Sequence, residues 1–95
     1  MARDLPPQIV RLRARMDRTN ARLAAAIQAR ARLALTISRR KALVGLPPAD
    51  PARERAMLHA VLAAAPEGLP RRDLERVFRA IFAASRRLVV RARGR

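Results

Sequence analysis

Residues 9–44, IVRLRARMDRTNARLAAAIQARARLALTISRRKALV, decide the fold because this stretch contains neither Pro nor Gly. Alternating steps of four and three residues from Ile9 select one face of a long helix, and most side chains on that face are apolar. Four polar residues interrupt it: Arg13, Asn20, Arg30 and Lys41. Since a buried, unpaired charge is very costly, we expect the cations to meet a counter-charge or a negatively charged ligand.

The composition of the 95 residues supports one domain, residues 1–95, with a modest core. Hydrophobic residues make up 51% of the chain, but there are two Phe and no Trp or Tyr, so the core must consist mainly of aliphatic side chains and Ala. Ala and Leu favour helices, and β-branched residues are few. We therefore predict an all-α fold whose ends, residues 1–7 and 91–95, fray.

The residues that the chain lacks exclude several kinds of site. No Cys is present, so neither disulfides nor thiolate metal sites are expected, and the single His makes no metal site. No apolar run approaches the ~20 residues of a membrane span. The N-terminal residues show no apolar run suited to a secretory signal. These features predict a cytoplasmic protein without a metal or a membrane contact.

The net charge of +15 raises the question of nucleic-acid binding, because clustered cations release counterions from phosphates. Of the 22 basic residues, however, only Lys41 is a lysine. We interpret the arginine excess as the imprint of a GC-rich genome, and the basic residues as a solvated surface. No aromatic platform accompanies them, which argues further against single-strand binding.

The first helix is expected to run from about Gln8 to about Val44 and to end at Gly45, a residue suited to the position after a helix. At ~1.5 Å per residue such a helix is roughly 55 Å long. A compact monomer of this size has a radius of gyration of only ~12–13 Å. One chain would therefore have difficulty covering the whole apolar face, and we predict an intertwined homodimer rather than an extended three-helix monomer.

Two shorter helices are predicted to follow. Asp50 is a good N-cap and Pro51 suits a first helical position, which predicts a second helix over residues 51–65. Pro70 is expected to open the third helix, whose apolar residues recur at helical spacing as far as Val89. The protein is thus predicted to contain three helices per subunit, one of them very long.

The polar residues expected to point inward form a candidate site: Arg13, Arg30, Lys41, Arg53, Glu54 and Ser85. Their excess of cations suits a ligand with two or more negative charges, and a planar guanidinium matches a carboxylate in a bidentate manner. Lys41 can stabilise an oxygen that becomes negative. Glu54 can accept a hydrogen bond from a ligand hydroxyl, or can instead pair with an arginine of the first helix. No nucleophile and base are available for covalent catalysis.

The order and spacing of these residues are similar to those of a known family. In the order Leu12-Arg13, Asn20, Arg30, Lys41, Asp50, Arg53-Glu54-Arg55, Phe78 and Ser85, the chain resembles the all-helical (AroQ-type) chorismate mutases, from about residue 9 to residue 89. The resemblance implies three helices per subunit in an interlocked dimer with two shared active sites. It also implies a cofactor-free, pericyclic conversion of chorismate to prephenate, in the synthesis of aromatic amino acids. The enzyme would accelerate this reaction by binding the reactive conformer of chorismate and by stabilising the negative charge that develops on the ether oxygen.

The resemblance implies roles for the three basic residues on the inner face of the long helix. Arg30, with Arg13 reaching in from the other subunit, would hold the two carboxylates of chorismate. Lys41 would donate to the ether oxygen as the C–O bond breaks. The substrate would then be a small dicarboxylate bound at a site that both subunits build.

The same resemblance implies roles for residues of the two shorter helices. Glu54 would engage the ring hydroxyl, and Asp50 and Arg53 would shape the neighbouring end of the pocket. Ser85 would contact a substrate carboxylate. Val89 departs from the family, which carries at this substrate-binding position a Gln or Glu that donates a second hydrogen bond to the ether oxygen.

This departure leaves alternatives open. Losing one such donor can lower the rate by about 10²–10³. The protein could be a weak mutase, could use an arginine of the C-terminal tail instead, or could act as an isochorismate pyruvate lyase or a 4-amino-4-deoxychorismate mutase. A further alternative is a non-catalytic basic dimer, which would bind nucleic acid or require a partner enzyme.

Overall fold

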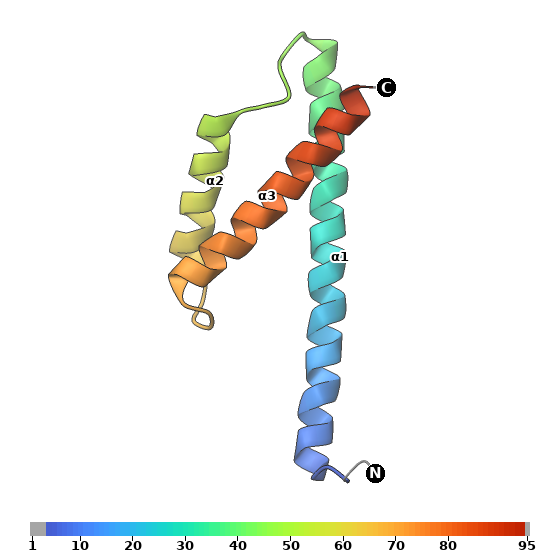
Figure 1. Ribbon diagram of the computed structural model, residues 1–95, viewed down its shortest axis with the longest axis vertical. Coiled ribbons are helices and arrows are strands. Elements are labelled where there is room, and N and C mark those ends of the chain that lie inside the picture. Colours follow the sequence, from blue (N-terminus) through green and yellow to red (C-terminus); the bar gives the residue numbers. More distant parts are fainter. Residues whose placement is uncertain (1–3, 95) are drawn as a thin grey trace. The chain divides into compact units, whose positions relative to one another are not determined.

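The computed structural model describes residues 4–94, and over this range its regular structure is entirely helical (Figure 1). The three helices are α1 (Pro7–Leu43), α2 (Pro51–Ala64) and α3 (Arg71–Arg93). Their bounds agree with the predicted ones to within one residue, except at the end of α3. None of the helices in residues 4–94 is long and apolar enough to cross a membrane. The all-α prediction is therefore confirmed.

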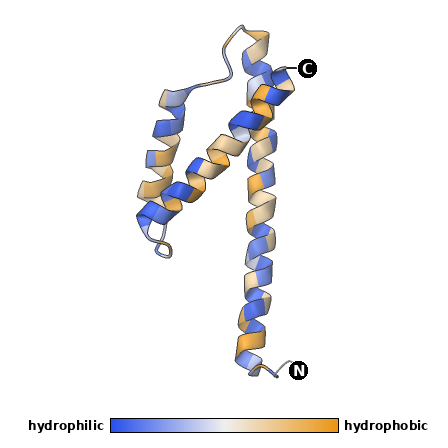
Figure 2. Cartoon of the chain, viewed as in Figure 1, coloured by the Kyte–Doolittle hydropathy of each residue, from blue (hydrophilic) through white to orange (hydrophobic). Residues whose placement is uncertain are grey.

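The chain divides into two compact units, Met1–Arg30 and Ala31–Arg95. The described part of the first unit is a single stretch of α1, which begins where the Ile9 and Val10 N–H groups both donate to the Pro6 carbonyl. No side chain in residues 4–30 is buried. Figure 2 shows apolar and polar residues interspersed along α1. The large apolar side chains exposed in this unit are Leu5, Ile9, Val10, Leu12, Met16, Leu23 and Ile27.

The second unit begins with the last turns of α1, which end at Gly45 as predicted. Gly45 has a φ of +73°, the left-handed conformation that glycine adopts without steric cost. The Leu46 N–H donates to the Lys41 carbonyl at 2.8 Å, and the Gly45 N–H donates to the Ala42 carbonyl at 3.2 Å. These two bonds form a Schellman motif, which satisfies carbonyls that the helix end would otherwise leave unpaired.

The second helix begins with the predicted cap. The Asp50 carboxylate accepts a hydrogen bond of 3.1 Å from the Arg53 N–H, and Pro51 occupies the first helical position. Helix α2 packs against α3. Their buried apolar side chains are Leu58 on α2 and Phe82 and Val89 on α3.

The third helix continues further than the sequence suggested. We predicted that residues 91–95 fray, but α3 extends to Arg93, so the prediction is wrong for residues 91–93. The cause is the Arg93 guanidinium, which bonds to other parts of the same unit. Its Nε donates to Ser38 Oγ at 3.0 Å, its Nη2 to the Ser38 carbonyl at 2.9 Å, and its Nη1 to the Leu46 carbonyl at 3.0 Å. Residue 95 and residues 1–3 lie outside the described range.

Candidate active site

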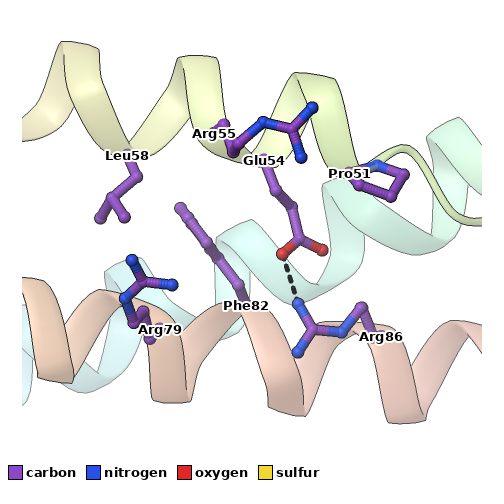
Figure 3. Close-up of a pocket in the computed structure, with 7 residues that line it drawn as sticks. All are labelled: Pro51, Glu54, Arg55, Leu58, Arg79, Phe82 and Arg86. Atoms are coloured by element: carbon purple, nitrogen blue, oxygen red, sulfur yellow. Dashed lines mark hydrogen bonds and ion pairs between the residues drawn. The ribbon is translucent and has the colours of Figure 1, made fainter.

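An ion pair between two helices marks the candidate site. Glu54 lies one turn before Leu58, on the face of α2 that meets α3, and its side chain is 27% exposed. Arg86, on α3, donates from Nη1 to Glu54 Oε1, as the dashed line in Figure 3 shows. The carboxylate therefore points toward the interior as predicted, but its partner comes from α3 and not from the first helix.

The pair borders a hollow of about 360 Å³ between α2 and α3. Leu58 and Phe82 form an apolar part of its wall, and in Figure 3 the Phe82 ring extends from α3 toward α2. The hollow is lined by Pro51, Glu54, Arg55, Leu58, Arg79, Phe82 and Arg86. Three guanidinium groups and one carboxylate face it, so its balance of charge is positive and suits an anionic ligand with an apolar ring.

Lys41 lies in the last turn of α1 and is half-buried. Its Nζ donates to the Pro48 carbonyl at 3.3 Å, a contact that links the ammonium group to the connection between α1 and α2. An ammonium group has three N–H donors, so this contact uses one of them. Lys41 can therefore still stabilise a negative oxygen of a ligand.

The predicted site residues of the first unit differ in exposure. Arg13 and Asn20 are exposed, whereas Arg30 is half-buried. We predicted that all three point inward along an apolar face, and for Arg13 and Asn20 this is not so within one chain. The reason is that no side chain in residues 4–30 is buried, so this stretch has no interior of its own. The role of Arg13 in a second subunit remains a prediction.

The remaining predicted residues lie at the start of α2 and in the second half of α3. Asp50 is exposed and caps α2, and Arg53 is also exposed, so within one chain neither side chain is buried and their roles in the site remain predictions. Arg53 does not line the hollow, whereas Arg55, which is likewise adjacent to Glu54, does. On α3, Ser85 is half-buried, and Val89 is buried at 8% exposure. The Val89 side chain therefore belongs to the apolar core and has no donor to offer a ligand.

Two arginines were missed by the sequence reasoning. Arg93 lies four residues after Val89, so continuing the apolar spacing of α3 by one turn would have placed it on the inner face. We had suggested that a tail arginine could replace the missing donor, but Arg93 bonds to Ser38 and Leu46. Arg86 lies four residues after Phe82, so the same spacing placed it on the inner face, but nothing local marked it as the partner of Glu54.

The helical architecture and the basic hollow define a class: an all-α protein with a site for a small anion. Within that class the chain belongs to the chorismate mutase type II family, whose family model matches residues 12–90. The expected family is thus confirmed over most of the chain.

Solved structures agree with this assignment. The chain is similar to chorismate mutase from Thermus thermophilus in form II, with 36% identity and a TM-score of 0.83 over 88% of this chain and 96% of that one. Form I of the same enzyme gives 36% identity and a TM-score of 0.79 over 82% and 98% of the two chains. A search of the curated proteins gave no significant match.

Proposed function

We propose that this protein is a chorismate mutase that converts chorismate to prephenate. The observation that carries the proposal is the family match over residues 12–90, together with 36% identity to a chorismate mutase of the same fold. The reaction is a pericyclic rearrangement, so it needs only groups that hold the reactive conformer and stabilise charge. Lys41 and Glu54 supply such groups, and a nucleophile is not required.

We assign the substrate contacts according to the resemblance. Lys41 donates to the ether oxygen, where negative charge develops as the C–O bond breaks. Arg30 and Arg13 bind the two carboxylates, since a guanidinium recognises a carboxylate in a bidentate manner. Glu54 accepts a hydrogen bond from the ring hydroxyl.

Three further residues complete this assignment. Asp50 and Arg53 shape the neighbouring end of the pocket, and Ser85 contacts a carboxylate. The Asp50 carboxylate accepts a hydrogen bond from the Arg53 N–H, so these two residues lie together at the start of α2. Ser85 lies one turn before Val89 on α3. These positions support the assigned roles.

We further propose that the active unit is a homodimer in the cytoplasm, with Arg13 of each subunit completing the site of the other. The exposed apolar side chains of residues 4–30 support the dimer. In proteins most helical stability comes from packing of an apolar face, and a partner would supply that packing to this part of α1. A second copy of the chain provides the same apolar face and a self-complementary arrangement. The proposed cytoplasmic location is the one that we expect for a sequence without cysteine.

Val89 supports a second candidate, in which the same scaffold acts on a relative of chorismate. Its buried isopropyl group cannot donate to the ether oxygen. Isochorismate pyruvate lyase and 4-amino-4-deoxychorismate mutase are the alternatives. Incubating the purified protein with each of the three substrates and separating the products by chromatography decides between them. Prephenate as the fastest product supports the first proposal.

The Lys41→Ala variant tests the catalytic assignment. Removing the donor to the ether oxygen should lower kcat by about 10²–10³. Arg40→Ala is the matched control, because Arg40 is an exposed cation in the same helical turn and its loss should leave kcat nearly unchanged. A Lys41→Ala enzyme as active as the control would contradict the role of Lys41.

A further inference from the structure

Arg86 and Glu54 differ from the other ion pair in the described part of the chain. Glu75 and Arg79 are one turn apart on α3 and 3.7 Å from each other, with side chains 38% and 65% exposed, against 27% and 50% for Glu54 and Arg86. Arg86 and Glu54 come from different helices, 32 residues apart in sequence. Both line the hollow. The pair of Arg86 and Glu54 therefore contributes charged groups to a hollow that can hold a ligand.

The charge of Glu54 raises a difficulty for a dianionic substrate. A carboxylate suits a ligand hydroxyl as an acceptor, but its negative charge repels the two carboxylates of the same ligand. This repulsion is stronger in a partly desolvated site than in water. A cation beside Glu54 offsets this repulsion and leaves the carboxylate able to accept from a hydroxyl.

We infer that Arg86 is this cation. It acts as a positioning residue that neutralises the Glu54 carboxylate and holds it toward the hollow, so that Glu54 can face a dianionic substrate. The inference rests on the proposed function. Arg86 lies four residues after Phe82 on the same face of α3, and both side chains reach the hollow. The pair lets the hollow combine an acceptor for a hydroxyl with the positive charge of Arg55, while Arg79, which also lines it, is paired with Glu75.

The test compares KM and kcat in Arg86→Gln with those in Arg87→Gln. Arg87 is the adjacent exposed arginine outside the hollow, so both variants lose the same net charge. Repulsion acts on substrate and transition state alike, so Arg86→Gln should mainly raise KM, about tenfold, with a smaller change in kcat. The rise should be larger at low salt, because salt screens the repulsion. Arg86→Lys should restore most of the loss.

The double variant Glu54→Gln/Arg86→Gln gives the sharpest readout. It removes both charges, and the amide oxygen of the glutamine introduced in place of Glu54 can still accept a hydrogen bond. KM should therefore fall back toward the wild-type value, whereas a merely structural pair predicts no such recovery. Thermal unfolding of each variant, at one protein concentration, shows whether the changes follow loss of folded protein.

Three results would overturn the inference. The first is an Arg86→Gln enzyme that behaves like Arg87→Gln, and the second is a rise in KM that does not depend on salt and follows the fall in melting temperature. The third is a double variant whose KM stays as high as that of Arg86→Gln. A wild-type protein without mutase activity would instead remove the proposed function. Calorimetric binding of prephenate, itself a dianion, would then decide the inference separately. Arg86→Gln should weaken that binding and the double variant should restore it, and equal affinities would refute the counter-charge role.

Discussion

Residues 7–30 form one continuous helix and residues 31–94 are mainly helical, but their side chains have very different surroundings. In residues 7–30 no side chain is buried, and apolar residues such as Met16 and Leu23 are more than half exposed. In residues 31–94 a small core is buried, with Leu58, Phe82 and Val89. The comparison shows that helical spacing alone does not tell whether an apolar face meets its own chain or another.

The physical reason is the source of helix stability. In proteins most of the stability of a helix comes from packing of its apolar face against other elements. The second unit supplies this packing together with a Schellman motif, an N-cap and a guanidinium contact. The described part of the first unit has apolar residues but no such packing within the chain. In the proposed dimer, the second subunit supplies this packing.

The largest effect is expected from Leu23→Asp, which places a charge in the proposed interface of both subunits. Because an unpaired charge in an apolar interface is very costly, the dimer dissociation constant should rise by roughly 10³-fold or more. Helix content and mutase activity should fall with it. Light scattering, circular dichroism and the chorismate assay measure the three changes.

Ala25→Asp is the control for this variant, because residue 25 lies on nearly the opposite side of the helix from residue 23. It introduces the same charge and should leave the dimer intact. A monomeric wild-type protein with full activity, or equal effects of the two substitutions, would mean that residues 7–30 need no partner.

An intermediate effect is expected from Arg93→Ala, which removes three hydrogen bonds to Ser38 and Leu46. Ser38 is only 5% exposed, so its polar atoms lose a partner where water has little access. The free energy of unfolding should fall by about 1.5–3 kcal/mol, the range for hydrogen bonds made by a charged group. Denaturant unfolding at constant protein concentration measures the change.

Arg91→Ala is the matched control, since Arg91 is an exposed arginine one half-turn earlier on α3. It should change the stability by less than about 0.5 kcal/mol, as is usual for surface substitutions. Ser38→Ala, which removes one of the three bonds, should lie between the two. Equal stabilities of Arg93→Ala and Arg91→Ala would show that α3 does not depend on this contact.

The smallest effect is expected from Gly45→Ala. An added Cβ would meet no atom within 4 Å, so only the positive φ opposes the substitution. A left-handed conformation costs a residue other than glycine about 1–2 kcal/mol, and the melting temperature should fall accordingly. Gly68→Ala is the control, because its Cβ also meets open space and its φ is not positive. A Gly68→Ala protein destabilised as much as Gly45→Ala would contradict this account.

The fold was predictable because its decisive signals are local. The C-terminal end of α1 follows from Gly45 and the start of α2 from Asp50 and Pro51, each of which acts on backbone groups within a few residues. The resemblance carried by the spacing from Arg13 to Ser85 led to the family that residues 12–90 match. What remained a prediction is the partner of the long helix, since an exposed apolar face does not identify what covers it.

The sequence by itself determined which chemical groups the protein carries and where most of its helices begin and end, because propensity, capping and turn formation act over one or two turns. Only the tertiary structure decided which arginine pairs with Glu54 and which groups Arg93 bonds to as it extends α3. Among 22 basic residues no local signal identifies these partners. The contacts of Arg86 and Arg93 span 32 and 55 residues, and depend on how each helix is rotated against the next.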